Sequence, residues 1–370
     1  MTSAAHVGSN LNAMEKLMSN GLNHLHVQDK HVFPLGDRPD MSQVCHSYTF
    51  PVIDLIDLDG LHRIKVVNDI RRACEEDGFF QIINHGVPET VMKSMMEIAK
   101  EFFEMPVEDR VCLYSEDPQQ AVRVSTSFNG TEDEFFEWKD YLRHPCHPLE
   151  EIINSWPQKP ALYREVAEKY CKEIRVLVLR LLAAISEALG QDSDYLNAIF
   201  GKHSQTLHVN YYPACPNPDL TFGVAPHSDA QGITVLMQGD VSGLQVLKDG
   251  KWVAVEPISN AFVVNVADQI QVVSNGRFKS AKHRAITNTT TARISIPTFY
   301  GPSLHTFIAP AASMVDKEHP ALYRGNKFEE YMRASWSKGV KVEHFGSLQN
   351  RNQSVMNLCC TYLAFLIIRD

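Results

Sequence analysis

The chain has 370 residues, 44% of them hydrophobic, which is enough to bury a full core in one catalytic domain with helical additions. A net charge of −9 without any lysine and arginine cluster argues against a nucleic-acid partner or an anionic membrane surface, so a small-molecule partner is expected. The eight cysteines are scattered without CxxC spacing, which indicates neither a disulfide framework nor a zinc ribbon and favours a reducing cytoplasm.

The first segment, residues 1–47, is polar and lacks sustained periodicity. We expect a flexible N-terminal extension there, apart from a short helix around 11–22. No apolar core of a signal peptide is present, which again indicates a cytoplasmic protein.

Residues 48–200 are predicted to form an N-terminal α/β region. Strands are expected at 50–58 and 79–87, with the helical pattern "RIKVVNDIRRACEEDG" between them. Two more helices are expected over 88–105 and 161–189, and Gly190 stands where a helix C-cap would lie.

From residue 201 to 345 the pattern changes to short strands with tight turns. The Asp-Gly pair in "KDGK" predicts a hairpin turn. The pattern predicts a β-sandwich or jelly-roll barrel, so the fold class is mainly β with flanking helices. The eight expected strands are 207–212, 232–238, 243–248, 251–257, 261–268, 269–276, 283–288 and 293–300.

The last segment, 346–370, is a tail to which the sequence assigns no role. Its apolar stretch, residues 355–368, is shorter than the roughly 20 residues that a membrane-spanning helix needs, so no membrane association is expected.

A metal site is suggested by "VAPHSDAQGITVL", residues 224–236. His227 and Asp229 are two positions apart, and alternate residues of a strand point to the same face. His283, which opens another expected strand, is the best candidate for a third ligand. Two imidazoles and one carboxylate with open positions are typical of non-haem Fe(II) oxygenases, whereas zinc prefers a tetrahedral cage or three ligands and water.

An anion site is suggested ten residues beyond His283. Arg293 and Ser295 in "RIS" lie on one strand face, where a guanidinium and a hydroxyl suit a planar carboxylate. Tyr212 in "NYYP" is a further candidate donor. Together these residues predict a pocket for a dicarboxylate whose other end chelates the metal.

Three other polar features receive no chemical role. "HPCH", residues 144–147, is expected to be a proline-rich surface loop, because no second cluster completes four ligands. His85 is expected to serve a turn or packing, and Asp268 to cap a turn.

At "NYYP", "HSD", His283, "RIS" and "DGFFQIINHGV" the sequence resembles the plant 2-oxoglutarate- and Fe(II)-dependent dioxygenase superfamily, over roughly residues 48–345. The resemblance implies a double-stranded β-helix (jelly-roll) core, an Fe(II) cofactor, and 2-oxoglutarate and O₂ as cosubstrates, with ascorbate in support. It implies metal ligation and catalysis by His227, Asp229 and His283, and 2-oxoglutarate binding by Arg293, Ser295 and Tyr212.

Within this superfamily, "VRVSTSFN" (122–129) and "EWKDYLRHPCHP" (137–148) resemble the group of salicylate hydroxylases of the downy-mildew-resistance type and soluble flavone synthases I. The resemblance implies hydroxylation or desaturation of a flavanone-type flavonoid, with succinate and CO₂ as coproducts; salicylate hydroxylation is the alternative. Phe299, Phe128 and His208 are the candidate contacts to an aromatic substrate.

Two other classes remain as alternatives. One is a small-molecule receptor that has lost turnover on the same barrel, although the open metal positions argue against it. The other is a zinc hydrolase, for which no general base is evident beside the metal. The absence of heptads and the negative charge favour a monomer.

Overall fold

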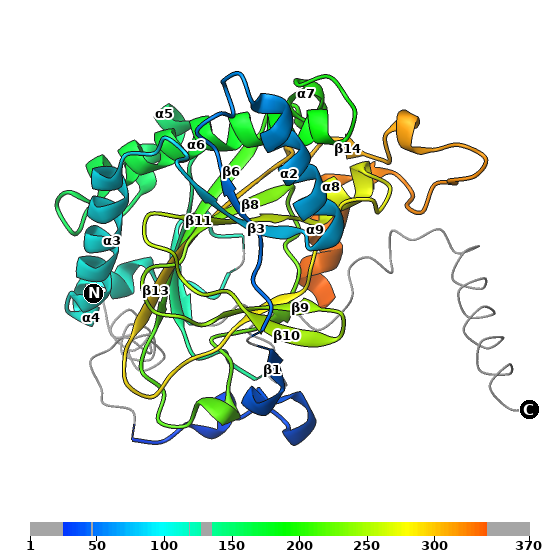
Figure 1. Ribbon diagram of the computed structural model, residues 1–370. Coiled ribbons are helices and arrows are strands. Elements are labelled where there is room, and N and C mark those ends of the chain that lie inside the picture. The colour runs from blue at the N-terminus through cyan, green and yellow to red at the C-terminus, as the bar shows by residue number, and fades with distance from the viewer. Residues whose placement is uncertain (1–24, 46, 118, 127–134, 339–370) are drawn as a thin grey trace, which may run out of the picture.

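The structure, a computed structural model, describes residues 25–45, 47–117, 119–126 and 135–338. Two β-sheets enclose a cavity, and helices cover the outer side of the larger sheet (Figure 1). This arrangement confirms the expected jelly-roll core with flanking helices. The expected helix at 11–22 and the tail 346–370 lie outside the described residues.

The larger sheet contains strands from both halves of the chain. β3 pairs with β11, and β5 pairs with β6, so the sheet continues across the boundary expected between residues 200 and 201. In spatial order its strands are β2 (Val52–Asp54), β3 (Phe79–Ile83), β11 (Phe262–Val266), β8 (Ile233–Met237), β13 (Arg293–Gly301), β6 (Ser204–Tyr212), β5 (Asp140–Pro145) and β4 (Arg123–Thr126).

The smaller sheet carries the strands on which the metal site is expected. The turn between β9 and β10 has positive φ angles at Asp249 (49°) and Gly250 (78°), which confirms the Asp-Gly hairpin turn. In spatial order its strands are β1 (Val44–Cys45), β10 (Lys251–Ala254), β9 (Leu244–Lys248), β12 (His283–Ala285) and β7 (Val224–His227). A separate pair is formed by β14 (Phe307–Ile308) and β15 (Asn326–Lys327).

Alternation along β13 shows how the larger sheet divides core from cavity. Ile294, Ile296 and Tyr300 pack into the main hydrophobic core. The residues between them, Arg293, Ser295, Pro297 and Phe299, line the cavity on the other face. One strand therefore supplies apolar side chains to the core and functional side chains to the site.

The long helices agree with the predicted patterns. Gly190, with φ of 81°, follows the longest of them, and its amide donates to the Glu187 carbonyl in a C-terminal cap. The α-helices are α2 (Arg63–Glu76), α3 (Glu89–Glu104), α4 (Val107–Arg110), α5 (Leu149–Ile152), α6 (Tyr163–Ala188), α7 (Tyr195–Phe200), α8 (Asp268–Val273) and α9 (Phe328–Lys338). Among the described residues, none of these has the combined length and apolar character needed to cross a bilayer.

The prediction of a strand at 269–276 is wrong, because most of this stretch forms helix α8. Ile270, Val272 and Val273 are all buried, and the surrounding positions are nearly all buried too. A short segment that is buried on every side has no periodicity by which helix and strand can be separated.

The prediction of a surface loop at 144–147 is also wrong in part. His144 and Pro145 belong to β5, and His144 is fully buried against Trp156, with ring centroids 4.3 Å apart. The His144 imidazole bonds the Tyr163 hydroxyl at 2.9 Å, and burial lowers its pKa to about 4, so the ring is neutral. The absence of a metal role that was expected for this motif stays a prediction.

Part of the segment expected to be a flexible extension, residues 25–45, packs on the barrel. Its end pairs with β10 as strand β1. Phe33 is buried against Phe222, and the His31 ring lies edge-on to Trp138 with centroids 5.3 Å apart. The aromatic burial explains why this polar stretch is ordered there.

Candidate active site

Three side chains form the group that we call the His–Asp–His triad: His227, Asp229 and His283. The Nε2 atoms of both histidines lie 3.6 Å from Asp229 Oδ1, and the three ligand atoms are all within 4.8 Å of one another. Two ligands at right angles, each about 2.1 Å from one ion, would be about 3 Å apart, so small movements suffice to close on a metal.

The two imidazoles present their Nε2 lone pairs to this point. His227 Nδ1 lies 2.9 Å from the Ala225 carbonyl, and His283 Nδ1 lies 3.2 Å from the Ala281 carbonyl. Because a carbonyl only accepts, each Nδ1 carries a hydrogen, which leaves Nε2 as the atom through which the ring could bind a metal. Burial, followed by the proximity of His283, lowers the pKa of His227 to about 3 and keeps the ring neutral.

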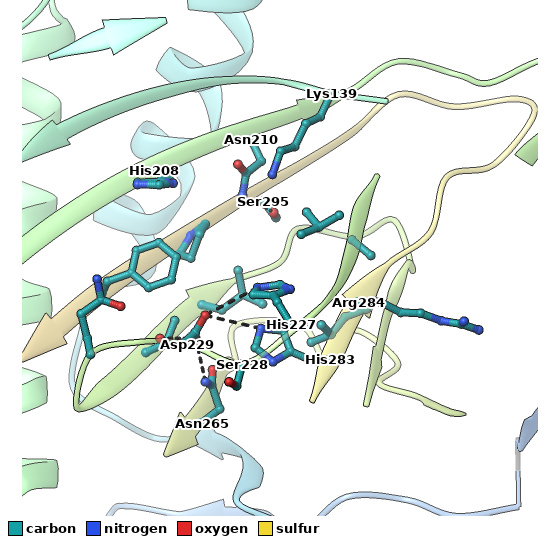
Figure 2. A pocket seen from close by; sticks show the side chains of 18 of the residues that line it. Lys139, His208, Asn210, His227, Ser228, Asp229, Asn265, His283, Arg284 and Ser295 are labelled. Carbon is teal, nitrogen blue, oxygen red and sulfur yellow. Dashed lines mark hydrogen bonds and ion pairs between the residues drawn. The ribbon is translucent and has the colours of Figure 1, made fainter. Parts of the chain in front are cut away.

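The carboxylate is oriented by two neighbours. Thr234 Oγ1 donates to Asp229 Oδ2 at 2.6 Å, and Asn265 Nδ2 donates to the same oxygen at 2.8 Å. Oδ1 is thereby directed to the histidines, as Figure 2 shows. Burial would raise the pKa of Asp229, but the two imidazoles and these hydrogen bonds lower it overall, so the group is ionised. An ionised carboxylate and two imidazoles that direct Nε2 to the same point fit an Fe(II) ion.

The chain assembles the triad differently from the expectation in one respect. β7 ends at His227, so Asp229 lies in the following turn and strand alternation does not place it. The Asp268 amide instead donates to the Asp229 carbonyl at 2.9 Å and holds this turn. His283 arrives as expected, because the antiparallel register of β12 and β7 sets it directly opposite His227.

A second set, which we call the Arg–Ser–Tyr set, comprises Arg293, Ser295 and Tyr212. Strand register places Arg293 opposite Tyr212, and the guanidinium lies 5.1 Å from the centroid of the tyrosine ring. Arg293 Nε donates to the Val241 carbonyl at 3.0 Å, which fixes the side chain. The Tyr212 hydroxyl is 3.5 Å from Ser295 Oγ. These donors converge as a carboxylate site requires.

Two glycines make room for this set. A Cβ on Gly243 would lie 3.0 Å from Arg293 Cδ and 2.9 Å from the Ile286 carbonyl oxygen. A Cβ on Gly223 would lie 2.6 Å from Cδ1 of the Tyr212 ring. Larger residues at either position would displace the donors, so glycine serves close packing here.

Both sets line the same cavity, of about 220 Å³. His208 and Phe299, expected to contact an aromatic substrate, also line it, whereas Phe128 lies outside the described residues. The His208 ring is edge-on to Phe299, with centroids 4.9 Å apart, and stacks on Tyr141 at 5.6 Å. The cavity therefore combines three side chains that could hold a metal ion, donors that suit a carboxylate, and an aromatic wall.

The sequence analysis missed several polar residues of the cavity, among them Asn210, Lys139 and Arg143. Asn210 is opposite Ser295 across the strand pair, with its Nδ2 3.5 Å from Ser295 Oγ. The signal that could have found Asn210 is strand alternation, because it stands two residues before Tyr212.

Asp268 does more than cap a turn. It begins α8, is fully buried, and accepts hydrogen bonds from Ser280 Oγ at 2.6 Å, from the Tyr331 hydroxyl, and from Ser228 Oγ at 3.4 Å. Burial raises its pKa to about 7. Asp268 thus connects helix α9, which carries Tyr331, to the turn that bears Asp229.

His85, by contrast, has the expected role in a turn, because its Nδ1 accepts from the Val87 amide at 3.1 Å.

The fold and these two sets define the class of non-haem iron oxygenases that use a 2-oxo acid. Residues 203–302 match the family model of the 2OG-Fe(II) oxygenase superfamily, and residues 50–159 match the N-terminal region of a non-haem dioxygenase in morphine synthesis. The chain belongs to the 2OG-Fe(II) oxygenase superfamily. It is a dioxygenase that uses Fe(II) and 2-oxoglutarate.

Relatives cover most of the chain. The protein DMR6-LIKE OXYGENASE 1 of Arabidopsis thaliana is 48% identical over 88% of this chain and 93% of its own length. Flavanone 3-dioxygenase 2 of Oryza sativa subsp. japonica is 41% identical over 85% of this chain and 92% of its own length. The crystal structure of JOX2 in complex with 2OG, Fe and JA is 34% identical, with a TM-score of 0.81 over 90% of this chain and 96% of that one.

Proposed function

We propose that this dioxygenase oxidises a flat phenolic compound, with the His–Asp–His triad as its iron ligands and the Arg–Ser–Tyr set as its 2-oxoglutarate site. The observation that carries the proposal is that one cavity joins both sets to an aromatic wall. Iron bound there supplies the activation of O₂ by which 2-oxoglutarate becomes succinate and CO₂ while the substrate is oxidised.

The protein's own residues orient the reactants. Arg293 and Ser295 hold the far carboxylate of 2-oxoglutarate, so that its 2-oxo acid end extends to the triad. The aromatic wall holds the substrate with one C–H bond toward the metal. Gain of one oxygen gives a hydroxylated product, and loss of two hydrogens gives a desaturated one; the pose of the substrate decides between them.

A flavanone-type flavonoid is the first candidate substrate. The Phe299 and His208 rings line the cavity edge-on to each other, and Tyr141 stacks behind His208; this aromatic wall suits an extended flat skeleton. The name of the rice relative, a flavanone 3-dioxygenase, supports this candidate.

A phenolic acid such as salicylate is the second candidate. Lys139 and Arg143 line the same cavity, and both cations suit a carboxylate. The likeness of "VRVSTSFN" and "EWKDYLRHPCHP" to the salicylate hydroxylases of the downy-mildew-resistance type also supports this candidate.

A substrate panel tests the proposal. The protein is purified anaerobically, loaded with Fe(II) and 2-oxoglutarate, and assayed with ascorbate for succinate and for product mass. We expect a naringenin-type flavanone to raise succinate formation above the substrate-free rate and to gain one oxygen or lose two hydrogens. Conversion of salicylate alone would replace the first candidate by the second, and stimulation by neither would overturn the substrate class.

Replacing Phe299 by alanine is expected to weaken the apparent affinity for the aromatic substrate about 10-fold, since an aromatic pair and its buried area are lost. The measurement is KM for the substrate at saturating 2-oxoglutarate. Phe307→Ala is the matched control, because Phe307 is 64% exposed on β14, outside the cavity lining. An unchanged KM in Phe299→Ala would remove this residue from the substrate site.

The proposed enzyme acts as a monomer in the cytoplasm. Its cysteines in the described residues are all free thiols, which suits a reducing compartment. Sedimentation of the purified protein at micromolar concentration tests the oligomeric state.

A further inference from the structure

Helix α9 reaches the substrate cavity through the side chain of Met332. Residues 228–231, which we call the Asp229 turn, line the cavity together with Met332, whereas Tyr331 next to it is buried outside the lining. We propose that Asp268 is a positioning residue for the substrate: through Tyr331 it fixes α9, so that Met332 forms one wall of the cavity. This inference rests on the proposed function and adds a residue that selects the substrate.

The start of α8 holds the Asp229 turn. The Asp268 amide donates to the Asp229 carbonyl at 2.9 Å, and the Gln269 amide donates to the Gln231 carbonyl at 2.9 Å. Gln269 Nε2 also donates to the Ala230 carbonyl at 2.8 Å. Because Asp268 and Gln269 are fully buried, water does not compete for these hydrogen bonds. The Asp229 turn is therefore fixed to α8.

The Asp268 carboxyl group extends this connection to α9. Its Oδ2 accepts hydrogen bonds from the Tyr331 hydroxyl and, at 3.4 Å, from Ser228 Oγ. Asp268 and Tyr331 are 0% and 1% exposed, so their contact lies inside the protein. Helices α8 and α9 lie on the same side of the barrel (Figure 1). One carboxyl group thus bonds the Asp229 turn through Ser228 and α9 through Tyr331.

Tyr331 lies between the anchored start of α9 and the cavity. At the start, Phe328 is buried in the main core, and its amide donates to the Thr306 carbonyl at 2.9 Å. Adjacent residues of a helix are about 100° apart around its axis, so Tyr331 can point into the protein while Met332 points to the cavity. Loss of the Tyr331 contact would therefore let Met332 move relative to the Asp229 turn.

The Met332 side chain suits contact with an aromatic ring. It is partly buried and packs against the main hydrophobic core. A thioether is flexible and polarisable, and its sulfur makes favourable contacts about 5 Å from aromatic rings. The aromatic wall also adjoins the triad, because Phe299 is aligned with Thr234 across the β13–β8 pair and Thr234 donates to Asp229 Oδ2. Met332 and the aromatic wall can therefore set the pose of one substrate.

The first test measures binding of naringenin and of salicylate by titration calorimetry to the full chain, loaded with Fe(II) and 2-oxoglutarate under argon. In Met332→Ala we expect the compound that binds the unmodified protein to bind about 5- to 10-fold more weakly, since apolar contact area is lost. Met314→Ala is the matched control, because Met314 packs against the same core outside the cavity lining. An unchanged dissociation constant in Met332→Ala would remove Met332 from the substrate site.

The second test removes only the hydroxyl that bonds Asp268. In Tyr331→Phe we expect the dissociation constant of the same compound to rise about 3- to 10-fold. Product formed per succinate should fall, because the substrate is held less precisely. Iron content and KM for 2-oxoglutarate should stay near those of the unmodified protein.

Tyr163→Phe is the control for this substitution. It removes another buried tyrosine hydroxyl, which bonds His144 at 2.9 Å away from the cavity lining. A dissociation constant in Tyr331→Phe equal to that of Tyr163→Phe and of the unmodified protein would overturn the inference.

Combining the two substitutions distinguishes positioning from a general loss of packing. Met332→Ala removes the group that Tyr331 positions, so the double variant should bind the compound as weakly as Met332→Ala alone. Independent effects would instead multiply the two losses of affinity, and that result would contradict the positioning role.

Hydrogen exchange of the α9 amides tests the link to Asp268 without any substrate. In Tyr331→Phe these amides are expected to exchange about 10-fold faster than in the unmodified protein, because a buried hydrogen bond is lost. Asp268→Ala removes the acceptor of the same bond and should show the same change. Thermal unfolding shows whether each variant folds, and if Asp268→Ala does not, Tyr331→Phe decides alone.

These measurements separate the two proposals. Failure of both compounds to bind and to stimulate succinate formation would contradict the proposed function, and exchange of the α9 amides would then decide the positioning role. Unchanged exchange in Tyr331→Phe would overturn this inference and leave the proposed function intact.

Discussion

Replacing Asp229 by alanine is expected to remove both the bound iron and the substrate-dependent formation of succinate. The carboxylate is the single anionic member of the triad, and its Oδ1 lies 3.6 Å from both histidine Nε2 atoms. Without it, two neutral imidazoles remain, which bind Fe(II) weakly. The loss should exceed the about 10- to 100-fold that removal of an outer hydrogen-bond partner costs.

Iron per chain by atomic absorption and succinate release by chromatography measure this effect. Asn265→Ala removes only a partner of Asp229 Oδ2, and we expect it to fall in the about 10- to 100-fold range. Asp219→Ala, at an exposed position near β7, serves as the control for loss of a carboxylate. Full iron content and turnover in Asp229→Ala would refute the proposed triad.

Arg293→Gln is expected to raise KM for 2-oxoglutarate by about 100-fold, because a buried charge-assisted contact to the carboxylate is lost. Arg293 is 3% exposed, and its Nε donates to the Val241 carbonyl, so the guanidinium is buried and held in one position. Arg293→Lys keeps the charge but loses the planar fork, and we expect an intermediate KM.

The test is whether Arg293→Gln changes KM for 2-oxoglutarate alone. KM for 2-oxoglutarate should rise far more than the affinity for the aromatic substrate falls, and iron content should stay near that of the unmodified protein. An unchanged KM for 2-oxoglutarate in Arg293→Gln would remove Arg293 from the 2-oxoglutarate site.

Elements with a clear repeat were predictable from local sequence. The helix at 161–189 shows an apolar stripe of helical period, and the structure has α6 at Tyr163–Ala188. The Asp-Gly pair at 249–250 marked the β9–β10 turn, because both residues tolerate positive φ. The stretch 269–276 had no such asymmetry, and burial on all sides made α8 indistinguishable from a strand.

The candidate site was partly predictable for the same reason. Arg293 and Ser295 are two residues apart on β13, and strand alternation alone puts them on one face. Asn210 could have been inferred from Tyr212 by the same rule. Lys139 and Arg143 could not, because nothing local indicates that β5 joins the larger sheet beside β6.

By itself the sequence determined the period of each strand and helix, the residues that share a face, and the types of donor available for a metal and a carboxylate. Only the tertiary structure decided which faces meet. The β12–β7 register set His283 opposite His227, and the contact of α8 with the turn after β7 placed Asp229. Strand pairing between residues far apart in the chain depends on the shared core and the cavity that the sheets enclose, and local sequence does not contain that information.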